Sequence, residues 1–138
     1  MKNLENNAKS IVWVNGCFDV LHRGHIEMLK HAKSLGDFLV VGIDSDERIR
    51  SAKGATRPFN TLNDRKFILE ALSCVDFVVS FSSDEELIQH VRSISPKFMV
   101  VGSDWKEKTV IGSTYVKQIV YFNRIGNYST TKILGEIK

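Results

Sequence analysis

One short stretch of this sequence brings together residues that can handle phosphate groups. It reads NGCFDVLHRGH, so a turn of Gly16, Cys17 and Phe18 precedes the two histidines His22 and His25. Glycine lets a backbone approach a ligand closely, and the free N–H groups at a helix N-terminus attract anions. Histidines at this spacing lie on one face of a helix start. The stretch therefore predicts a phosphate-binding turn with two imidazoles facing the ligand.

Other interpretations of these histidines compete with phosphate binding. A single histidine at this place more often caps a helix or lies half-buried in a core. Here two histidines flank Gly24, which leaves room for a nucleotide against the turn. A metal site is the other alternative, but no further cluster of Cys, His or carboxylate residues completes one, so we predict no metal ligands.

The elements that would position this stretch follow from the apolar pattern. Five short runs, rich in β-branched and aromatic residues, are typical of buried strands. They are Ile11 to Val14, Phe38 to Ile43, Phe77 to Phe81, Phe98 to Val101 and Ile119 to Phe122. Because these runs are continuous rather than alternating, we expect a parallel sheet that is covered on both faces.

Helical spacing recurs between these runs. It places Ile26 to Leu35 in a first helix that stops at Gly36, and Phe67, Ile68, Ala71 and Leu72 on the inner face of a second. A third helix enters at Ser82 to Asp84, and Ser129 to Thr131 would cap a last one. We predict mobile loops over 53–60 and 106–114. The whole is a doubly wound (Rossmann-like) α/β fold of about five parallel strands, in which ligands bind at the topological switch point.

Length and composition limit the class of protein. The 138 residues predict one domain over 1–138 with a polar N-terminal segment over 1–10. The net charge of +3 comes from basic residues scattered among acidic ones, which does not favour nucleic-acid binding. No apolar run is long enough for a membrane span or a signal peptide. Cys17 and Cys74 lack metal or redox spacing, so we expect a cytoplasmic protein with reduced thiols.

At this point the sequence resembles the HxGH nucleotidyltransferases of the cytidylyltransferase-like superfamily. The resemblance rests first on Gly16 to Asp19 and His22 to His25. Further motifs follow in family order along nearly the whole chain: Lys53-Gly54, Arg57-Pro58, Asp64-Arg65, Gly102 to Trp105 and Ser129 to Thr131. The resemblance implies transfer of a nucleotidyl group from a nucleoside triphosphate to a phosphorylated acceptor, with release of pyrophosphate.

Two subfamilies compete on different parts of the chain. Arg57 to Asn60, Val75 to Val79 and Val110 to Ser113 look like the adenylyltransferase domain of ADP-heptose synthase. The tail from Arg124 to Thr131 looks instead like the signature of glycerol-3-phosphate and choline-phosphate cytidylyltransferases, from which it departs at Ile125 and Asn127. The nucleotide is therefore CTP or ATP, with a slight preference for CTP, and the acceptor is a phosphorylated polyol or sugar.

The resemblance also implies a role for individual residues. Catalytic roles fall to His22, His25, Lys53 and Arg124, and nucleotide binding to Gly16, Cys17, Phe18, Gly24, Asp104, Trp105, Ser129 and Thr130. Asp44 and Arg65 would contact the acceptor. Mg²⁺ is expected because the charge of the triphosphate must be neutralised, and relatives suggest a homodimer.

Simpler roles stay open for several of these residues. Lys53 could be a solvated loop lysine, Arg124 could belong to a surface ion pair, and Ser129 with Thr130 could cap a helix. Arg65 could pair with a carboxylate in a structural role, and Asp44 could contact a metal ion or cap a turn. For the whole protein, the alternatives to cytidylyl transfer are a heptose 1-phosphate adenylyltransferase and a non-catalytic nucleotide-binding sensor.

Overall fold

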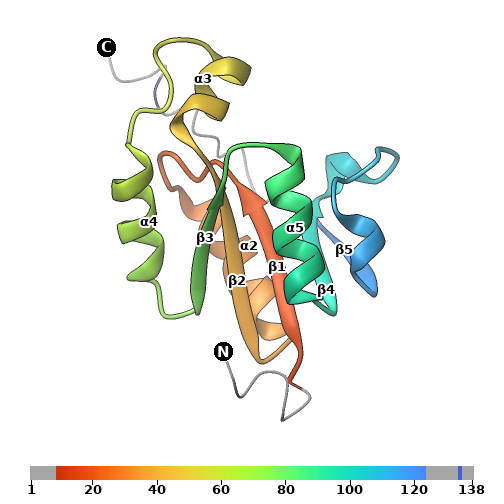
Figure 1. Cartoon of the computed structure of the whole chain (residues 1–138). Helices are drawn as coiled ribbons and strands as arrows, with labels where there is room; N and C mark the ends of the chain where they lie inside the picture. The colour runs from red at the N-terminus through yellow and green to blue at the C-terminus, as the bar shows by residue number, and fades with distance from the viewer. Residues whose placement is uncertain (1–8, 124–133, 135–138) are drawn as a thin grey trace.

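Five parallel strands run through the centre of the molecule (Figure 1). The computed structural model describes residues 9–123 and Leu134. The strands are β1 (Ile11–Gly16), β2 (Phe38–Asp44), β3 (Phe77–Phe81), β4 (Phe98–Gly102) and β5 (Gln118–Phe122). Each contains or overlaps one of the apolar runs, because a strand buried on both faces needs apolar side chains at successive positions. The prediction of five strands is confirmed.

The strand order is β3-β2-β1-β4-β5, and every neighbouring pair is parallel. The chain therefore winds outward from β1 in one direction and then returns to continue from β4 in the other. This is the doubly wound order, with its switch point between β1 and β4. The predicted Rossmann-like fold is confirmed.

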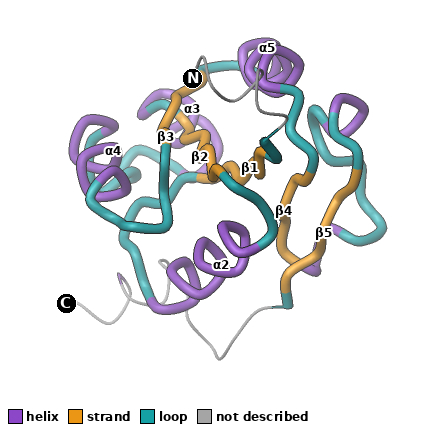
Figure 2. Tube along the Cα trace, turned by 90° about the horizontal axis from the view of Figure 1, so that it is seen from below, coloured by secondary structure: helices purple, strands orange, loops and turns teal. Residues whose placement is uncertain are grey.

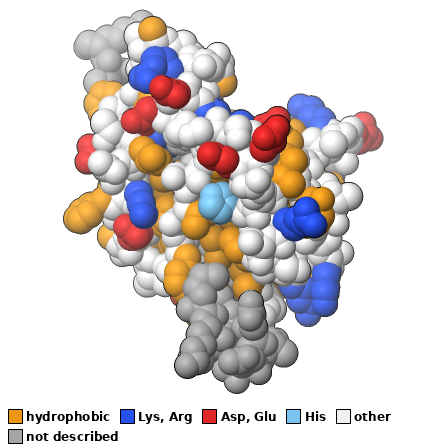
Figure 3. Space-filling model, viewed as in Figure 1, with side chains coloured by type: hydrophobic (Ala, Val, Ile, Leu, Met, Phe, Trp, Pro, Cys, Tyr) orange, Lys and Arg blue, Asp and Glu red, His pale blue; other side chains and the backbone are white. Residues whose placement is uncertain are grey.

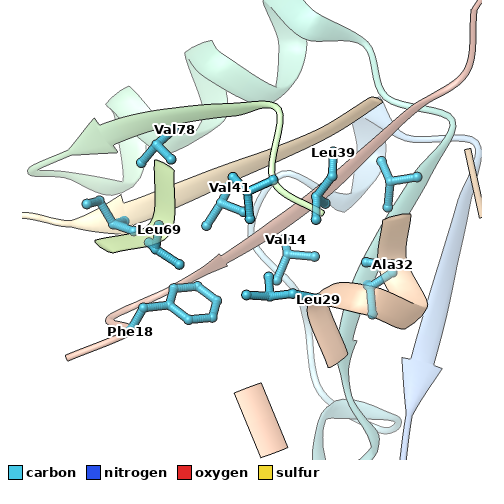
Figure 4. Close-up of a cluster of buried hydrophobic side chains, with 12 residues drawn as sticks. Val14, Phe18, Leu29, Ala32, Leu39, Val41, Leu69 and Val78 are labelled. Carbon is cyan, nitrogen blue, oxygen red and sulfur yellow. The ribbon is translucent and has the colours of Figure 1, made fainter. Parts of the chain in front are cut away.

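Helices cover both faces of the sheet (Figure 2). On one face, α2 (Arg23–Ser34) and α4 (Leu62–Glu70) bury Leu29 and Leu69 against alternate side chains of the strands, including Val14 and Val41 (Figure 4). On the other face, α5 (Asp84–Ile94) buries apolar side chains against those that point the opposite way, with Trp13 among them. Fully burying one such side chain contributes about 1.5–3 kcal/mol, so these two clusters hold the layers together.

The strands β1 and β4 are paired over only part of their length. The paired residues of β1 and β4 end at Trp13 and Met99, whereas the pairing of β1 with β2 continues to Gly16 and Ile43. Beyond Trp13 the carboxyl end of β1 therefore has a bonded neighbour on one side only. This leaves a crevice at the switch point, the place where open α/β sheets bind ligands.

A helix that the sequence analysis did not predict follows β2 directly. It is α3 (Asp46–Lys53), capped by Ser45, whose side chain accepts a hydrogen bond from the Arg48 N–H, and ended by Gly54 at φ 103°. Ile49 is its one buried residue, so there was no apolar period to detect. Lys53 is thus the last residue of a helix rather than the first of a loop.

The inner face predicted for α4 was wrong. Phe67 and Ile68 are 75% and 39% exposed, whereas Arg65 and Leu69, one helical turn apart, are fully buried. The prediction assumed that the aromatic residue points inward, but a buried arginine takes part of that face.

Two short 3₁₀ turns, Ser103–Trp105 and Ser113–Tyr115, flank the 106–112 segment. None of the described helices has the length and apolar character needed to cross a membrane.

Candidate active site

A pocket opens at the carboxyl ends of the central strands. Its volume is about 420 Å³, within the range of small-molecule sites. The residues that line it come from β1 and its following turn, α2, β2, α3 and the segment after it, α5, β4 and the segment after that strand: Val14, Asn15, Gly16, Cys17, Phe18, Asp19, His25, Met28, Asp44, Arg48, Lys53, Arg57, Leu87, Val100, Val101, Gly102, Trp105, Val110 and Ile111. The pocket therefore lies where the topology predicts a ligand. Of the residues expected at the site, it is lined by Gly16, Cys17, Phe18, His25, Asp44, Lys53 and Trp105.

The two histidines lie side by side at the start of α2. Their rings stack with centroids 3.8 Å apart and an interplanar angle of 25°. His22 is the N-cap residue, and its backbone N–H donates to Nδ1 of His25 at 3.2 Å. Because Nδ1 of His25 accepts this hydrogen bond, its neutral ring carries the proton on Nε2, where it can be donated to a ligand.

His25 is held in its neutral form. Burial, with smaller effects from the neighbouring His22 and Lys53, lowers the pKa of His25 to about 4. At neutral pH this imidazole therefore offers a hydrogen bond without a charge. A bound polyphosphate would oppose these effects, because an anion beside an imidazole favours its protonated form.

Lys53 reaches the same part of the pocket from the end of α3. Its side chain is exposed and lines the pocket. Burial and the Asp44 carboxylate raise the pKa of the Cys17 thiol, and Lys53 opposes this shift only in part. Cys17 is therefore a neutral thiol in the free protein, which fits a contact residue and does not fit a thiolate nucleophile.

The turn between β1 and α2 is closely packed. A Cβ added at Gly16 would lie 3.2 Å from the Phe18 ring, so a larger residue here would push against the neighbouring aromatic side chain. Phe18 has a φ of 48°, which non-glycine residues seldom adopt, and it is 4% exposed with its ring 5.3 Å from that of His25. The turn is thus fixed by its own side chains, which keeps its backbone N–H groups in place.

Arg65, expected at the acceptor, lies beneath the pocket instead. It is fully buried and donates to the carbonyl oxygens of Cys17, Asp44 and Asn60 at 2.9, 2.8 and 3.1 Å. It also donates to the Asp46 carboxylate at 2.7 Å. All these partners belong to the protein and Arg65 does not line the pocket, so it braces the ends of β1 and β2. The predicted pairing with a carboxylate is confirmed, and the contact with the acceptor stays a prediction.

Asp19 plays a similar bracing role that the sequence analysis did not assign. The residue is 2% exposed, and its carboxylate accepts hydrogen bonds from the N–H groups of Phe59 and Asn60 at 2.7 and 2.8 Å. It also pairs with Arg57 at 3.2 Å. Asp19 and Arg57 both belong to motifs noted in the sequence, but only the structure shows that the two motifs contact each other.

The side of the pocket next to β4 is more apolar. Trp105 is 44% exposed and lines it together with Val100, Val110 and Ile111. An exposed indole beside an apolar surface offers a stacking site for a nucleobase. Asp104 precedes Trp105 in the same 3₁₀ turn and is itself exposed.

Some expected residues are not placed in the pocket. Gly24 lies in the first turn of α2, next to the histidines, but does not line the pocket, and neither His22 nor Asp104 lines it. Arg124, Ser129 and Thr130 lie outside the described residues. Like Asp19, Arg48 was missed by the sequence analysis, and it lines the pocket from α3, the helix that was not predicted.

The described residues offer no ready-made cage for a metal ion. Over 9–123 and Leu134 there is no group of three or more His, Cys, Asp or Glu side chains placed to hold one. Basic and acidic side chains are interspersed over the described part of the face shown in Figure 3. This pattern fits a small anionic ligand in a pocket better than a polyanion along a surface.

Comparisons with known proteins agree with this site. The model of the cytidylyltransferase-like family matches residues 13–134. Over 138 residues the chain is 44% identical to the bifunctional protein HldE of Helicobacter pylori (strain G27) and 42% identical to that of Helicobacter hepaticus. The chain spans only 30% and 28% of the length of these two relatives.

Solved structures extend the likeness to the fold. The lipopolysaccharide core biosynthesis protein of Thermoplasma volcanium superposes with a TM-score of 0.67 at 27% identity, over 88% of this chain and 99% of that one. Pantoate-beta-alanine ligase of Francisella tularensis superposes with a TM-score of 0.61 at 17% identity, over 92% and 68%, and shows the fold alone. The histidine pair at the switch point and the family match lead to one conclusion: this chain belongs to the cytidylyltransferase-like family and is a nucleotidyltransferase.

Proposed function

We propose that this nucleotidyltransferase moves an adenylyl group from ATP to a sugar 1-phosphate, with heptose 1-phosphate as the acceptor. The support is the likeness over the full chain to proteins named HldE, together with the middle segments that resemble the adenylyltransferase domain of ADP-heptose synthase. The lipopolysaccharide core biosynthesis protein at 27% identity agrees with it. These comparisons favour adenylyl transfer over the cytidylyl transfer preferred from the sequence.

The reaction needs alignment more than it needs a strong base. A phosphate monoester has a second pKa of about 6, so the acceptor is already an anionic nucleophile at neutral pH. One of its oxygens forms a bond to the α-phosphorus of ATP, the bond from that phosphorus to the bridging oxygen breaks, and pyrophosphate leaves with the electron pair. Transfers of this kind are catalysed mainly by positioning and by stabilising the developing charge.

The described residues supply these two contributions. His25 donates from Nε2 to the phosphate chain, His22 stands beside it, and the ammonium of Lys53 faces the same space. The apolar side next to Trp105 takes the nucleobase. The observation that carries the proposal is the stacked histidine pair at the switch point, of which His25 lines the pocket together with Lys53.

Magnesium would enter with the nucleotide. Mg²⁺ at such sites keeps several waters and binds mainly to substrate phosphates. That fits a pocket whose described residues form no metal cluster. The ion would neutralise part of the triphosphate charge, and the protein residues would orient the chain.

The test is pyrophosphate release from purified protein with ATP or CTP against a panel of sugar and polyol phosphates. We expect release with ATP and heptose 1-phosphate. Replacing His25→Ala should reduce kcat by about 100-fold or more, because removing one preorganised donor costs about that much. The matched control is His31→Ala, an exposed residue of the same helix outside the pocket, which should leave kcat unchanged.

Other outcomes would separate the alternatives. Release with CTP and glycerol 3-phosphate alone would replace adenylyl transfer by cytidylyl transfer. Tight nucleotide binding without release from any pair would favour the sensor. Near-normal turnover of His25→Ala would remove His25 from the mechanism.

A further inference from the structure

The wall of the pocket formed by the end of β2 and by α3 carries a set of charges that the transfer step does not use. Arg48 donates from Nε to Oδ1 of Asp44 at 2.8 Å and from Nη2 to Oδ1 of Asp84 at 2.7 Å. Its guanidinium carbon lies 5.3 Å from the centroid of the Phe81 ring. Arg48 is thus held by β2, β3 and the first turn of α5, and it lines the pocket in this fixed position.

The Asp44 carboxylate keeps hydrogen-bonding capacity toward the pocket. Its side chain is 16% exposed and lines the cavity. Oδ1 is bound by Arg48, whereas Oδ2 is contacted by the Cys17 thiol at 3.6 Å. A thiol is a weak donor, and each carboxylate oxygen can accept more than one hydrogen bond. A hydroxyl group in the pocket can therefore bond to Oδ2 in place of the thiol or beside it.

The pairing with Arg48 decides what Asp44 can bind. One guanidinium holds the carboxylates of Asp44 and Asp84, and of these two carboxylates only that of Asp44 lines the pocket. A carboxylate fixed in this way accepts hydrogen bonds and donates none, so it favours hydroxyl donors. Cys17 is influenced by Asp44 on one side and by Lys53 on the other. The pocket thus offers a site for hydroxyls next to a site for phosphate.

We propose that Arg48 is a specificity-determining residue that holds Asp44 in place to accept hydrogen bonds from the hydroxyl groups of the acceptor sugar. Arg48 acts through Asp44 as a positioning residue, and Asp44 makes the contact. This inference rests on the proposed function, since it assigns a place to the acceptor of that transfer. It predicts a preference for acceptors rich in hydroxyl groups over a small one such as glycerol 3-phosphate.

The experiment uses the full chain with the substitutions Asp44→Asn, Arg48→Gln and Arg48→Lys. Controls are Glu47→Gln and Arg50→Gln, which are exposed residues of α3 outside the pocket. Two measurements are made on each protein: KM and kcat from pyrophosphate release with ATP, and equilibrium binding of heptose 1-phosphate in the presence of a non-hydrolysable ATP analogue. The affinity for the analogue itself shows whether the pocket is folded.

For Asp44→Asn we expect KM and the dissociation constant for heptose 1-phosphate to rise by about 10- to 100-fold, the value of a hydrogen bond to a charged group. KM for ATP should change less than about twofold, and the controls should behave as the wild type. Arg48→Gln should weaken the binding of heptose 1-phosphate and reduce the preference for it over glycerol 3-phosphate. Arg48→Lys should restore part of the affinity and part of the preference, because lysine keeps the positive charge but cannot bond to two carboxylates with the geometry of a guanidinium.

Two results would overturn the inference: unchanged affinity for heptose 1-phosphate in Asp44→Asn and Arg48→Gln, or equal weakening of the ATP analogue, which would place Asp44 in the nucleotide site. The failure of the proposed transfer looks different. In that case the wild type would release no pyrophosphate, while the binding measurement would still decide whether Asp44 and Arg48 recognise the sugar.

Discussion

His25 shows how one hydrogen bond defines the chemistry of a side chain. Its Nδ1 accepts from the backbone of His22, so Nε2 is left as the donor for a ligand. Burial, with smaller effects from His22 and Lys53, keeps the ring neutral in the free protein. The same contact stabilises the first turn of α2, so the capping role and the proposed catalytic role, which the sequence analysis gave as alternatives, are compatible in one residue.

The pKa of His25 should be measured directly by NMR titration of the imidazole. We expect a pKa of about 4 in the free protein and the Nε2–H tautomer at neutral pH. Adding ATP should raise this pKa, because the phosphates favour the imidazolium form. His31 serves as the internal reference. A His25 pKa at or above its ordinary value in the free protein would contradict this account.

The same shift makes stability depend on pH. The folded protein binds the His25 proton less readily than the unfolded chain, so the unfolding free energy should decrease as the pH falls from about 6.5 toward about 4. The contribution is fully present above pH 6.5. Comparing urea unfolding of the wild type and His25→Gln at pH 7 and pH 5 isolates it. Equal losses in the two proteins would show that His25 is not the cause.

At the scale of elements, a few buried polar residues hold the strand ends in place. Arg65 connects the turn after β1, the end of β2, the start of α3 and the segment before α4. Asp19 connects the same turn to residues 57–60. The pocket walls that carry Cys17 and Asp44 are therefore fixed from below, which keeps the proposed phosphate-binding groups at set positions.

Replacing Arg65→Met should destabilise the fold by about 2–4 kcal/mol, because three carbonyls and a carboxylate lose a buried donor. Chemical denaturation measures the loss. Arg50→Gln, an exposed arginine of α3, is the control and should change stability by less than about 0.5 kcal/mol. A cost for Arg65→Met as small as that of the control would mean that the brace is not structural.

The sequence could predict the strands but not every helix. Continuous apolar runs identify buried strands because both faces must be covered, and the structure places all five where those runs lie. α3 has one buried residue, so its stability depends on the Ser45 cap and on contacts that no local pattern shows. In α4 the fully buried residue Arg65 is charged. A search for apolar residues at helical spacing assigns only apolar residues to the core, so it does not find a buried arginine.

The candidate site was predictable to the extent that it consists of contiguous motifs. The stretch from Gly16 to His25 predicted the turn, the helix start and the paired imidazoles. Arg48 was missed because its role depends on Asp44 and Asp84, which meet it only in the folded chain. The hydrogen bonds of Arg65 to backbone carbonyls could not be predicted, because a sequence does not show which carbonyls the fold brings to its side chain.

For the molecule as a whole, the switch point brings the residues together. The partial pairing of β1 with β4 opens the crevice, α2 presents the histidines and α3 presents Lys53 and Arg48. The expected homodimer and cytoplasmic location stay predictions. So does the requirement for Mg²⁺, which we propose enters with the nucleotide.

That assignment predicts how chelation acts. EDTA should abolish pyrophosphate release but leave the thermal midpoint of the protein without nucleotide unchanged, since no structural ion is removed. Restoring Mg²⁺ should restore the activity. A fall in the midpoint of the nucleotide-free protein on adding EDTA would point to a resident metal ion instead.

The central claim is tested most directly by identifying the product. The full chain is incubated with Mg²⁺, heptose 1-phosphate and an equal mixture of ATP and CTP, and the products are analysed by mass spectrometry and ³¹P NMR. The account predicts ADP-heptose and pyrophosphate in equal amounts, and far less of both with His25→Ala. Formation of a CDP-linked product in place of ADP-heptose, or an undiminished yield with His25→Ala, would contradict it.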